Sequence, residues 1–235
     1  LPPDCSRPPN SSRIGFYAGT STKIIMLYLT RIVVVATVLV LVPAMTLAQD
    51  LDHTLRFIWE EAPFPRAHAS TIVETPDGSL ISAWFGGTGE GNKDVGVWSS
   101  RRPKGGDWLP PTELYKEPGQ PAWNPVLFQD ASDTIWLFFK VGPSPREWSG
   151  AYMKSTTSGR RWTDPVWLPA GMLGPVRAKP ITLASGDILA GTSWESYEAW
   201  SSWIEISADG GESWTKHGPI LFGDMAQDRK GTIQP

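Results

Sequence analysis

The sequence predicts an all-β fold of repeated four-stranded sheets, a β-propeller. The first observation is a segment of the form Ser-x-Asp-x-Gly-x-Ser-Trp at residues 207–214, which occurs in altered form twice earlier in the chain. The second is a ladder of similar segments at intervals of 55 or 56 residues. The third is that no segment has the 3.6-residue apolar periodicity of a helix. A repeat of this length in a strand-rich chain is typical of propeller blades.

The segment 207–214 has a physical logic as a tight turn. The carboxylate of Asp209 can accept hydrogen bonds from backbone N–H groups, and glycine supplies backbone angles closed to other residues. Trp214 is a wedge large enough to fill the gap between neighbouring sheets. Looser copies lie at 100–108 and 155–162, the latter with Thr in place of Asp. We call these segments the first, second and third boxes in chain order.

The first 48 residues precede the repeats. Residues 1–25 hold Cys5, the only cysteine, and are rich in Pro, Ser and Asn, so we interpret them as disordered or as upstream sequence foreign to the natural protein. Residues 26–48 combine a basic residue, an apolar run at 32–42 and a small-residue cleavage site, which predicts a signal peptide removed before Gln49. The run is shorter than the roughly 20 residues of a membrane span. An uncleaved anchor is the alternative.

Composition fits an exported protein. Without its first 48 residues the chain has no cysteine and must rely on core burial rather than on disulfides. The net charge is −3 and no basic stripe is present, which argues against nucleic-acid binding. We expect a secreted or periplasmic location without stable membrane insertion. The sequence does not indicate the oligomeric state.

Each repeat contains an inner strand, a turn, a second strand, a polar loop and a third strand that leads into a box. The expected strands are 69–73, 80–85 and 95–99 in the first blade, 126–128, 135–141 and 151–154 in the second, and 181–183, 188–192 and 202–206 in the third. A further strand-like segment, 54–59, precedes them. The chain stops where a fourth inner strand would start. Three blades cannot close a ring, so we expect residues 49–235 to be a C-terminally truncated propeller, unstable and inactive by itself because its end blades expose apolar faces and strand edges.

The strand order predicts two rims. The upper rim holds the starts of the inner strands and the loops after the second strands, and the lower rim holds the boxes. The ladder residues His68, Asn124, Lys179 and Gln234 belong to the upper rim, and four different polar types at one repeat position argue against a shared structural role. The upper rim should also collect Arg66, Glu90, Asp94, Trp123, Lys140, Arg146, Trp148, Arg177, Glu195 and Tyr197. Such a set of charged and aromatic residues suits an acidic-sugar site.

Together these motifs resemble the N-terminal half of the sialidase (neuraminidase)-like family of BNR/Asp-box repeat propellers. The resemblance covers residues 55–235 and rests on His68-Ala69-Ser70-Thr71, Trp84 to Gly91, Asp94-Val95, Asn124-Pro125, Lys140 to Pro145, Lys179-Pro180 and Gln234-Pro235. It implies a six-bladed propeller in the full protein, of which about three blades are present. It also implies glycan cleavage.

The resemblance suggests roles for some of these residues and marks one departure. Family members clamp the substrate carboxylate with three arginines, the first in an Arg-Ile-Pro motif, where this chain has Arg66-Ala67-His68. Arg66 can take that role, whereas His68 changes the chemistry. The acid/base aspartate of the family corresponds to Asp94, with Glu90 as its competitor. Capping of the third strand by Asp94 and a structural hydrogen bond from His68 are the alternatives.

Two activities and one binding function remain open from the sequence. An exo-α-sialidase-type hydrolase would use Asp94 as the acid that protonates the leaving oxygen. A propeller lyase would use His68 as base or acid on a uronate-containing glycan. A non-catalytic carbohydrate-binding propeller is the third possibility. The substrate contacts we expect are Arg66, Trp123, Asn124, Lys140, Arg177, Lys179, Glu195 and Gln234, and we expect neither a cofactor nor a metal, since no metal-ligand spacing is present.

Overall fold

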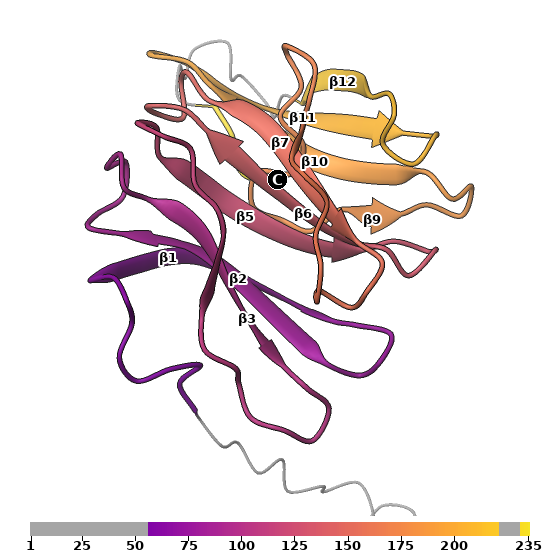
Figure 1. Cartoon of the computed structure of the whole chain (residues 1–235). Helices are drawn as coiled ribbons and strands as arrows, with labels where there is room; N and C mark the ends of the chain where they lie inside the picture. The colour runs from indigo at the N-terminus through magenta and orange to yellow at the C-terminus, as the bar shows by residue number, and fades with distance from the viewer. Residues whose placement is uncertain (1–55, 221–230) are drawn as a thin grey trace, which may run out of the picture. The chain divides into compact units, whose positions relative to one another are not determined.

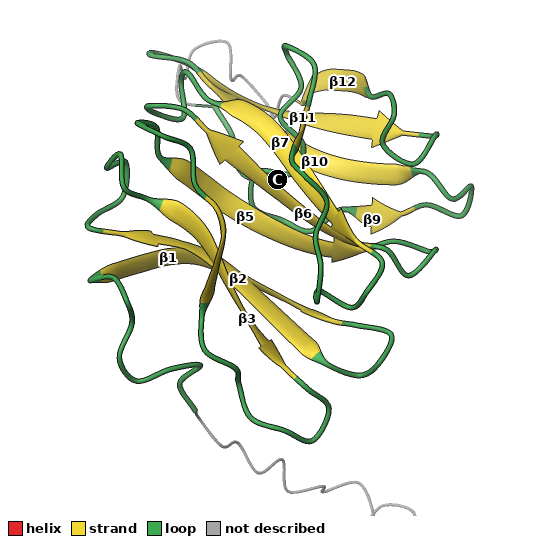
Figure 2. Ribbon diagram, in the orientation of Figure 1, coloured by secondary structure: helices red, strands yellow, loops and turns green. Residues whose placement is uncertain are grey.

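The computed structural model describes residues 56–220 and 231–235. The expected signal peptide and upstream segment lie outside these residues. Twelve strands form three antiparallel sheets of four, and the described residues contain no helix (Figures 1 and 2). The expectation of an all-β chain made of repeated four-stranded sheets is confirmed.

The three sheets follow one another along the chain as blades. The first blade contains β1 (Arg66–Glu74), β2 (Leu80–Gly87), β3 (Gly96–Arg102) and β4 (Thr112–Tyr115). The second contains β5 (Ala122–Gln129), β6 (Ile135–Val141), β7 (Ser149–Ser155) and β8 (Val166–Trp167). The third contains β9 (Ile181–Thr182), β10 (Ile188–Glu195), β11 (Trp200–Ser207) and β12 (Thr215–Ile220). In each blade the strands are neighbours in sequence order, as the repeat predicts.

The pairing also separates the two rims within each blade. Ser207, where the third box begins, lies opposite Ile188 at the start of β10, whereas the loop after Glu195 lies at the other end of that strand. In the first blade Arg66 pairs with Gly87, so the start of β1 and the loop after β2 share one end of the sheet. These ends correspond to the predicted lower and upper rims.

The inner strands show that one predicted alignment is wrong by a residue. Both β1 and β5 contain a bulge, after His68 in one and after Trp123 in the other, and these two residues pair with Phe85 and Lys140. His68 is therefore equivalent to Trp123, not to Asn124. The equivalents of Asn124 (φ 41°) are Ala69 (φ 54°) and Gln234 (φ 56°), which share its left-handed backbone. An extra residue in a bulge reverses the alternation of side chains. In the first blade the position equivalent to Asn124 holds Ala69, so the predicted ladder of polar residues is interrupted there.

The segment before the first blade also differs from expectation. Arg56 to Trp59, the described part of the strand-like segment 54–59, is not a strand. Instead the ring of Trp59 packs against Trp84 of β2 at 4.2 Å between centroids. Phe64 follows and is buried against Trp98 of β3. Aromatic content here reflects packing on the blade rather than strand pairing.

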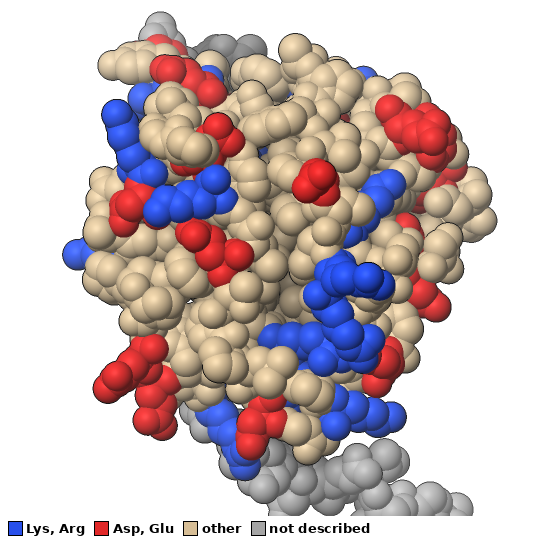
Figure 3. Space-filling view, viewed as in Figure 1, with Lys and Arg blue, Asp and Glu red and all other residues tan. Residues whose placement is uncertain are grey.

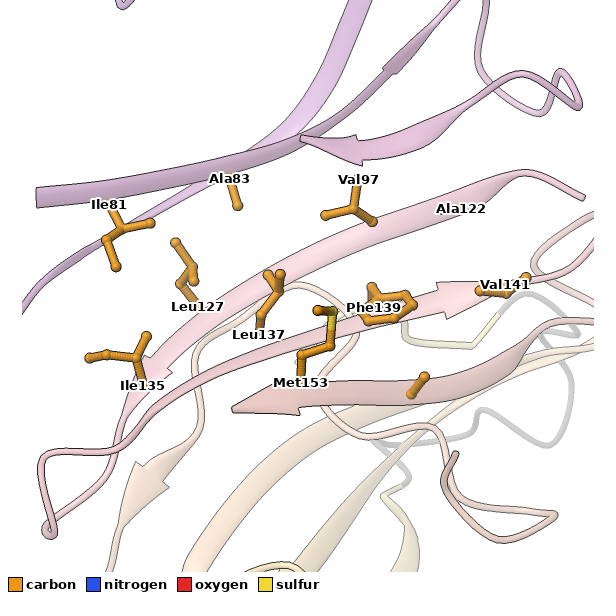
Figure 4. Packing of buried hydrophobic residues seen from close by; sticks show 11 residues of the cluster. Ile81, Ala83, Val97, Ala122, Leu127, Ile135, Leu137, Phe139, Val141 and Met153 are labelled. Carbon is orange, nitrogen blue, oxygen red and sulfur yellow. The ribbon is translucent and has the colours of Figure 1, made fainter. Parts of the chain in front are cut away.

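The second blade is joined to both of its neighbours by β6. Alternate side chains of a strand point to opposite faces, and all seven residues of β6 are buried. Leu137 and Phe139 pack with residues of the first blade such as Val97, as Figure 4 shows. Trp136 and Phe138 face the other way and pack with residues of the third blade. The continuous apolar run of β6 therefore reflects burial between two sheets.

The third box acts as the predicted wedge. Asp209 accepts hydrogen bonds from the Ser207 hydroxyl and from both the backbone N–H and the hydroxyl of Ser213. The bonds from Ser213 lower the pKa of Asp209 to about 2. Trp214 is buried edge-on against Phe138 of the second blade. A hydrogen bond joins the same two blades, since the hydroxyl of Tyr152 in β7 donates to the carbonyl of Gly211 in the third box. The third box thus fastens the third blade to the second.

The contact of Gly211 with the second blade gives a stability prediction. Gly210 and Gly211 both have positive φ, 71° and 93°, but a Cβ at Gly211 would lie 2.4 Å from the Trp136 ring, whereas a Cβ at Gly210 meets nothing within 4 Å. Gly210→Ala should cost about 1 kcal/mol from backbone strain alone. Gly211→Ala should cost roughly a further 1–3 kcal/mol from overpacking. Urea denaturation of the two variants measures the difference, and equal costs would show that the box does not press on Trp136.

Candidate functional site

A cavity of about 430 Å³ opens at the upper rim of the first blade. It lies between the start of β1, the end of β2 and the loop that joins β2 to β3. Its lining consists of Pro65, Arg66, Ala67, His68, Phe85, Gly87, Gly89, Glu90 and Val95. Three predicted site residues, Arg66, His68 and Glu90, therefore meet in one opening.

The centre of the cavity is an imidazole–carboxylate pair. The Nδ1 atom of His68 lies 3.4 Å from Oε2 of Glu90, and both side chains are more than half exposed. Phe85 is buried and places its ring at 89° to the imidazole, with 5.5 Å between centroids. The contacts with Phe85 and with the Glu90 carboxylate together orient the imidazole. A solvent-accessible pair of this kind can take a proton from a bound molecule or give one to it.

Arg66 supplies positive charge at the mouth of the cavity. It is the first residue of β1, exposed to solvent, and it forms no salt bridge with any residue in the described ranges. A planar guanidinium can bind a carboxylate through two parallel hydrogen bonds. The position of Arg66 therefore suits the acidic group of a ligand.

Asp94 closes the loop that carries Glu90. It does not line the cavity. Its carboxylate accepts hydrogen bonds from the backbone N–H of Thr88 at 2.8 Å and from the Thr88 hydroxyl at 2.7 Å. These two bonds lower the pKa of Asp94 below its usual range. A general acid must hold its proton at the working pH, so this environment suits a loop anchor better than a proton donor.

The same loop is supported by the second blade. Gly91 has a φ of 79°, and a Cβ there would lie 3.2 Å from the ring of Trp123. Asn92 donates from its side-chain amide to the Thr88 hydroxyl, which is the hydroxyl that Asp94 binds. Glu90 is thus presented by a loop fixed at both ends and in the middle.

Two tryptophans that we expected at the upper rim, one of them as a substrate contact, are buried instead. Trp123 and Trp148 are 6% and 8% exposed and pack with Leu173 and Val176. The indole N–H of Trp123 donates to the carbonyl of Gly142 at 2.7 Å. Their rings have almost no free face for a ligand. They support the rim from below rather than lining it.

Lys140 is also buried and does not reach the surface. Its ammonium donates to the carbonyl of Pro175 at 2.8 Å, and burial lowers its pKa to about 7, an effect that nearby Glu205 partly offsets. Glu205 in turn accepts hydrogen bonds from the backbone N–H groups of Leu173 and Gly174. The two charged residues, one from each blade, hold the segment between β8 and β9. The prediction that Lys140 contacts substrate does not fit this burial.

The family follows from comparison with known proteins. Residues 78–235 match the model of the BNR repeat-like domain. The chain belongs to this family. No curated protein sequence gives a match.

Solved structures place this BNR-repeat protein among sialidase-type propellers by fold. A microbial sialidase named Hadza Hz136 matches with 18% identity and a TM-score of 0.56 over 66% of this chain and 37% of its own. NanB sialidase from Streptococcus pneumoniae matches with 12% identity and a TM-score of 0.57 over 74% and 48%. A Dyadobacter fermentans protein described as of unknown function matches with 18% identity and a TM-score of 0.55 over 67% and 56%. Identities this low concern the fold alone. The chain spans between about a third and just over half of these structures.

The remaining candidate residues of the BNR-repeat protein lie outside the cavity. Arg177 is exposed just before β9. Lys179 donates to the carbonyl of Ile72 in β1, and burial of its ammonium lowers its pKa. Asn124 occupies the bulge position of β5, and Gln234 has the same left-handed backbone. Glu195 ends β10 half-buried, and burial raises its pKa. Whether any of them contacts a ligand stays a prediction.

The described surface carries charges of both signs. Figure 3 shows basic and acidic side chains spread over one face, with one continuous group of basic side chains in its lower middle. Within residues 56–220 and 231–235 there is no group of three or more His, Cys, Asp or Glu side chains that could hold a metal ion. The same residues include no helix capable of crossing a membrane.

The loop anchor can be tested by hydrogen exchange. Asp94→Asn should speed amide exchange across residues 88–94, because a neutral amide is a weaker acceptor for the two Thr88 hydrogen bonds. In the parent protein the anchor should persist above the ordinary carboxyl pKa and weaken only as the pH falls through the lowered pKa of Asp94. Glu74→Gln, at the opposite end of β1, is the control. Unchanged exchange in Asp94→Asn would contradict the anchoring role.

Lys140 gives a second test in this region. Lys140→Met should lower the free energy of unfolding by about 1–3 kcal/mol, because the Pro175 carbonyl loses its donor and Glu205 loses its nearest compensating charge. Ligand affinity should change little. Exposed Lys104→Met is the control, and chemical denaturation together with a glycan-binding titration separates the two effects. A large loss of affinity without loss of stability would restore Lys140 to the binding site.

Proposed function

We propose that the full-length protein is a secreted glycoside hydrolase of exo-α-sialidase type that acts on acidic glycans. The observation that supports it most is the upper-rim cavity, in which a guanidinium and an imidazole–carboxylate pair face one opening. Membership of the BNR repeat-like family is consistent with this chemistry. Secretion rests on the signal-peptide pattern of residues 26–48.

The proposed reaction divides the work among the cavity residues. Arg66 binds the carboxylate of the sugar and fixes its orientation. Glu90 donates a proton to the glycosidic oxygen as the bond to the sugar carbon breaks. A water molecule then forms a new bond to that carbon, and the neighbouring His68 and Glu90 take up the proton that the water loses. Asp94, the acid that the family resemblance suggests, is the alternative donor, and its hydrogen bonds to Thr88 argue for Glu90.

The exposed imidazole supports elimination as a second candidate reaction. His68 would remove the proton α to the carboxylate of a uronate, while Arg66 binds that carboxylate and stabilises the charge that develops. The leaving oxygen would then depart with a proton from Glu90, and a carbon–carbon double bond would form. This candidate reaction requires the histidine at position 68, where the sialidase-like family has the proline of its Arg-Ile-Pro motif.

Incubation of the full-length protein with sialylated and uronate-containing glycans distinguishes the candidates. Release of free sialic acid supports hydrolysis, and rising ultraviolet absorbance from an unsaturated uronate supports elimination. Glu90→Gln should lower kcat by about 10²–10⁴-fold, whereas Arg66→Lys should mainly raise KM. Glu74→Gln is the matched control for a lost carboxylate. If the parent protein cleaves no glycan and the Glu90→Gln variant still binds glycans, the protein is a binding module and the enzymatic proposal fails.

A further inference from the structure

Two turns from neighbouring blades place a guanidinium and an aromatic ring in contact on the upper rim. Arg146 lies in the loop between β6 and β7, and Tyr197 lies in the loop between β10 and β11. The central carbon of the Arg146 guanidinium is 4.8 Å from the centroid of the Tyr197 ring. Tyr197 is 76% exposed, the largest value among the bulky residues of this rim. Neither residue belongs to the cavity of the first blade.

Hydrogen bonds fix the turn that carries Arg146. The hydroxyl of Ser144 accepts from the backbone N–H of Arg146, and its carbonyl accepts from that of Glu147. Trp148, two residues after Arg146, is buried and anchors the turn from below. The guanidinium is therefore carried on a short, closed loop rather than on a free segment.

The turn that carries Tyr197 is closed in a similar way. Ser196 donates from both its backbone N–H and its hydroxyl to the carbonyl of Ala199, and Ala199 donates back to the Ser196 hydroxyl. The ring of Tyr197 lies at the tip of this closure. A ligand that binds two preformed turns loses less free energy to ordering the protein than one that must organise them.

The chemistry of the contact defines what it can bind. A guanidinium stacked on a ring keeps its in-plane N–H groups available for the two oxygens of a carboxylate. Arg146 forms no salt bridge in the described ranges, although its charge is near enough to Glu195 to offset part of the rise in pKa that burial gives that carboxyl. The exposed phenol ring offers an apolar face and a polar edge, which suits packing against the C–H face of a sugar. The arrangement therefore matches a sugar that carries a carboxylate.

Aromatic contacts connect this contact to the first cavity. Phe85, which lines the cavity, lies 6.1 Å from Trp123, and Trp123 lies 6.1 Å from Trp148 at the foot of the Arg146 turn. The rings form one continuous buried support under both places. The cavity and the contact of Arg146 with Tyr197 therefore lie on the same rim above one set of packed rings.

We propose that Arg146 and Tyr197 form a second sugar subsite, which binds a carboxylate-bearing residue further along the glycan whose end occupies the first cavity. The placement of the glycan end rests on the proposed function, whereas the subsite itself rests on the contact of the two turns. The subsite would select chains with acidic residues in succession over chains with a single acidic end.

Binding titrations with full-length protein test the subsite. The probes are single sugars and trimers of sialic acid and of galacturonate, together with trimers whose carboxyl groups have been reduced. Arg146→Gln should weaken binding of the preferred acidic trimer roughly tenfold to a hundredfold, the effect of one lost charge-assisted pair. The loss for the single sugar should be at least tenfold smaller. Tyr197→Ala should weaken acidic and reduced trimers alike.

Two exposed residues away from both places provide control variants. Arg161→Gln, exposed in the second box, and Trp167→Ala, exposed in β8, should bind every probe as the parent protein does. Acidic trimers that bind equally well to the parent, Arg146→Gln and Tyr197→Ala overturn the subsite, even if glycans are cleaved. Absence of trimer binding in the parent also overturns it. Binding that depends on Arg146 without cleavage supports the subsite and refutes the hydrolase.

Discussion

Burial of β6 on both faces is the constraint on which the rest of the fold depends. The chain has no helix in its described part to cover a sheet, so each sheet must find its apolar partner in another sheet. The second blade satisfies this need twice, through Leu137 and Phe139 on one side and Trp136 and Phe138 on the other. The third box completes the second contact by inserting Trp214. The loops of the upper rim are thus carried by strands that are packed against a neighbouring blade.

The same constraint explains the unusual environment of Lys140. Lys140 follows Phe139 in β6, so its side chain points to the face of the sheet that packs on the third blade, where it is fully buried. A buried ammonium is costly unless it is hydrogen-bonded and its charge is compensated. Pro175 and Glu205 supply those two conditions. Lys140 thus helps to join the second and third blades, although it is a charged residue in a strand buried on both faces.

The repeat made most of the fold predictable. Its spacing gives the length of each blade, and the order of apolar runs and polar loops within it gives the strands and the rim at which each loop lies. It could not predict the direction of individual side chains. His68 and Asn124 looked equivalent in sequence, and only the bulges revealed that His68 aligns with Trp123. Burial of Trp123 and Lys140 was equally hidden, since it depends on the facing blade rather than on local sequence. Glu205 was missed because the alternation Ile204-Glu205-Ile206 predicts a carboxylate on the solvent face of the strand, whereas the facing segment of the second blade buries it.

For Arg66, His68 and Glu90, the sequence correctly predicted proximity because all three lie at one end of the first blade. The part played by Asp94 could not be read in this way. A carboxylate in a glycine-rich loop has the same appearance in sequence whether it faces solvent or accepts two hydrogen bonds from Thr88. The distinction is one of backbone conformation over a few residues.

The bulges of β1 and β5 separate each inner strand into two parts with different freedom to vary. Below the bulge, Thr71 and Val126 keep the register with the second strand. Above it, the equivalent positions hold an exposed histidine in one blade and a buried tryptophan in the next. Because the extra residue absorbs the change in direction, an exchange at the exposed His68 position of β1 need not disturb the core, whereas Trp123 of β5 is itself part of a buried cluster. Where the residue above the bulge is exposed, as in the first blade, ligand preference can change at the upper rim while the sheet below the bulge stays the same.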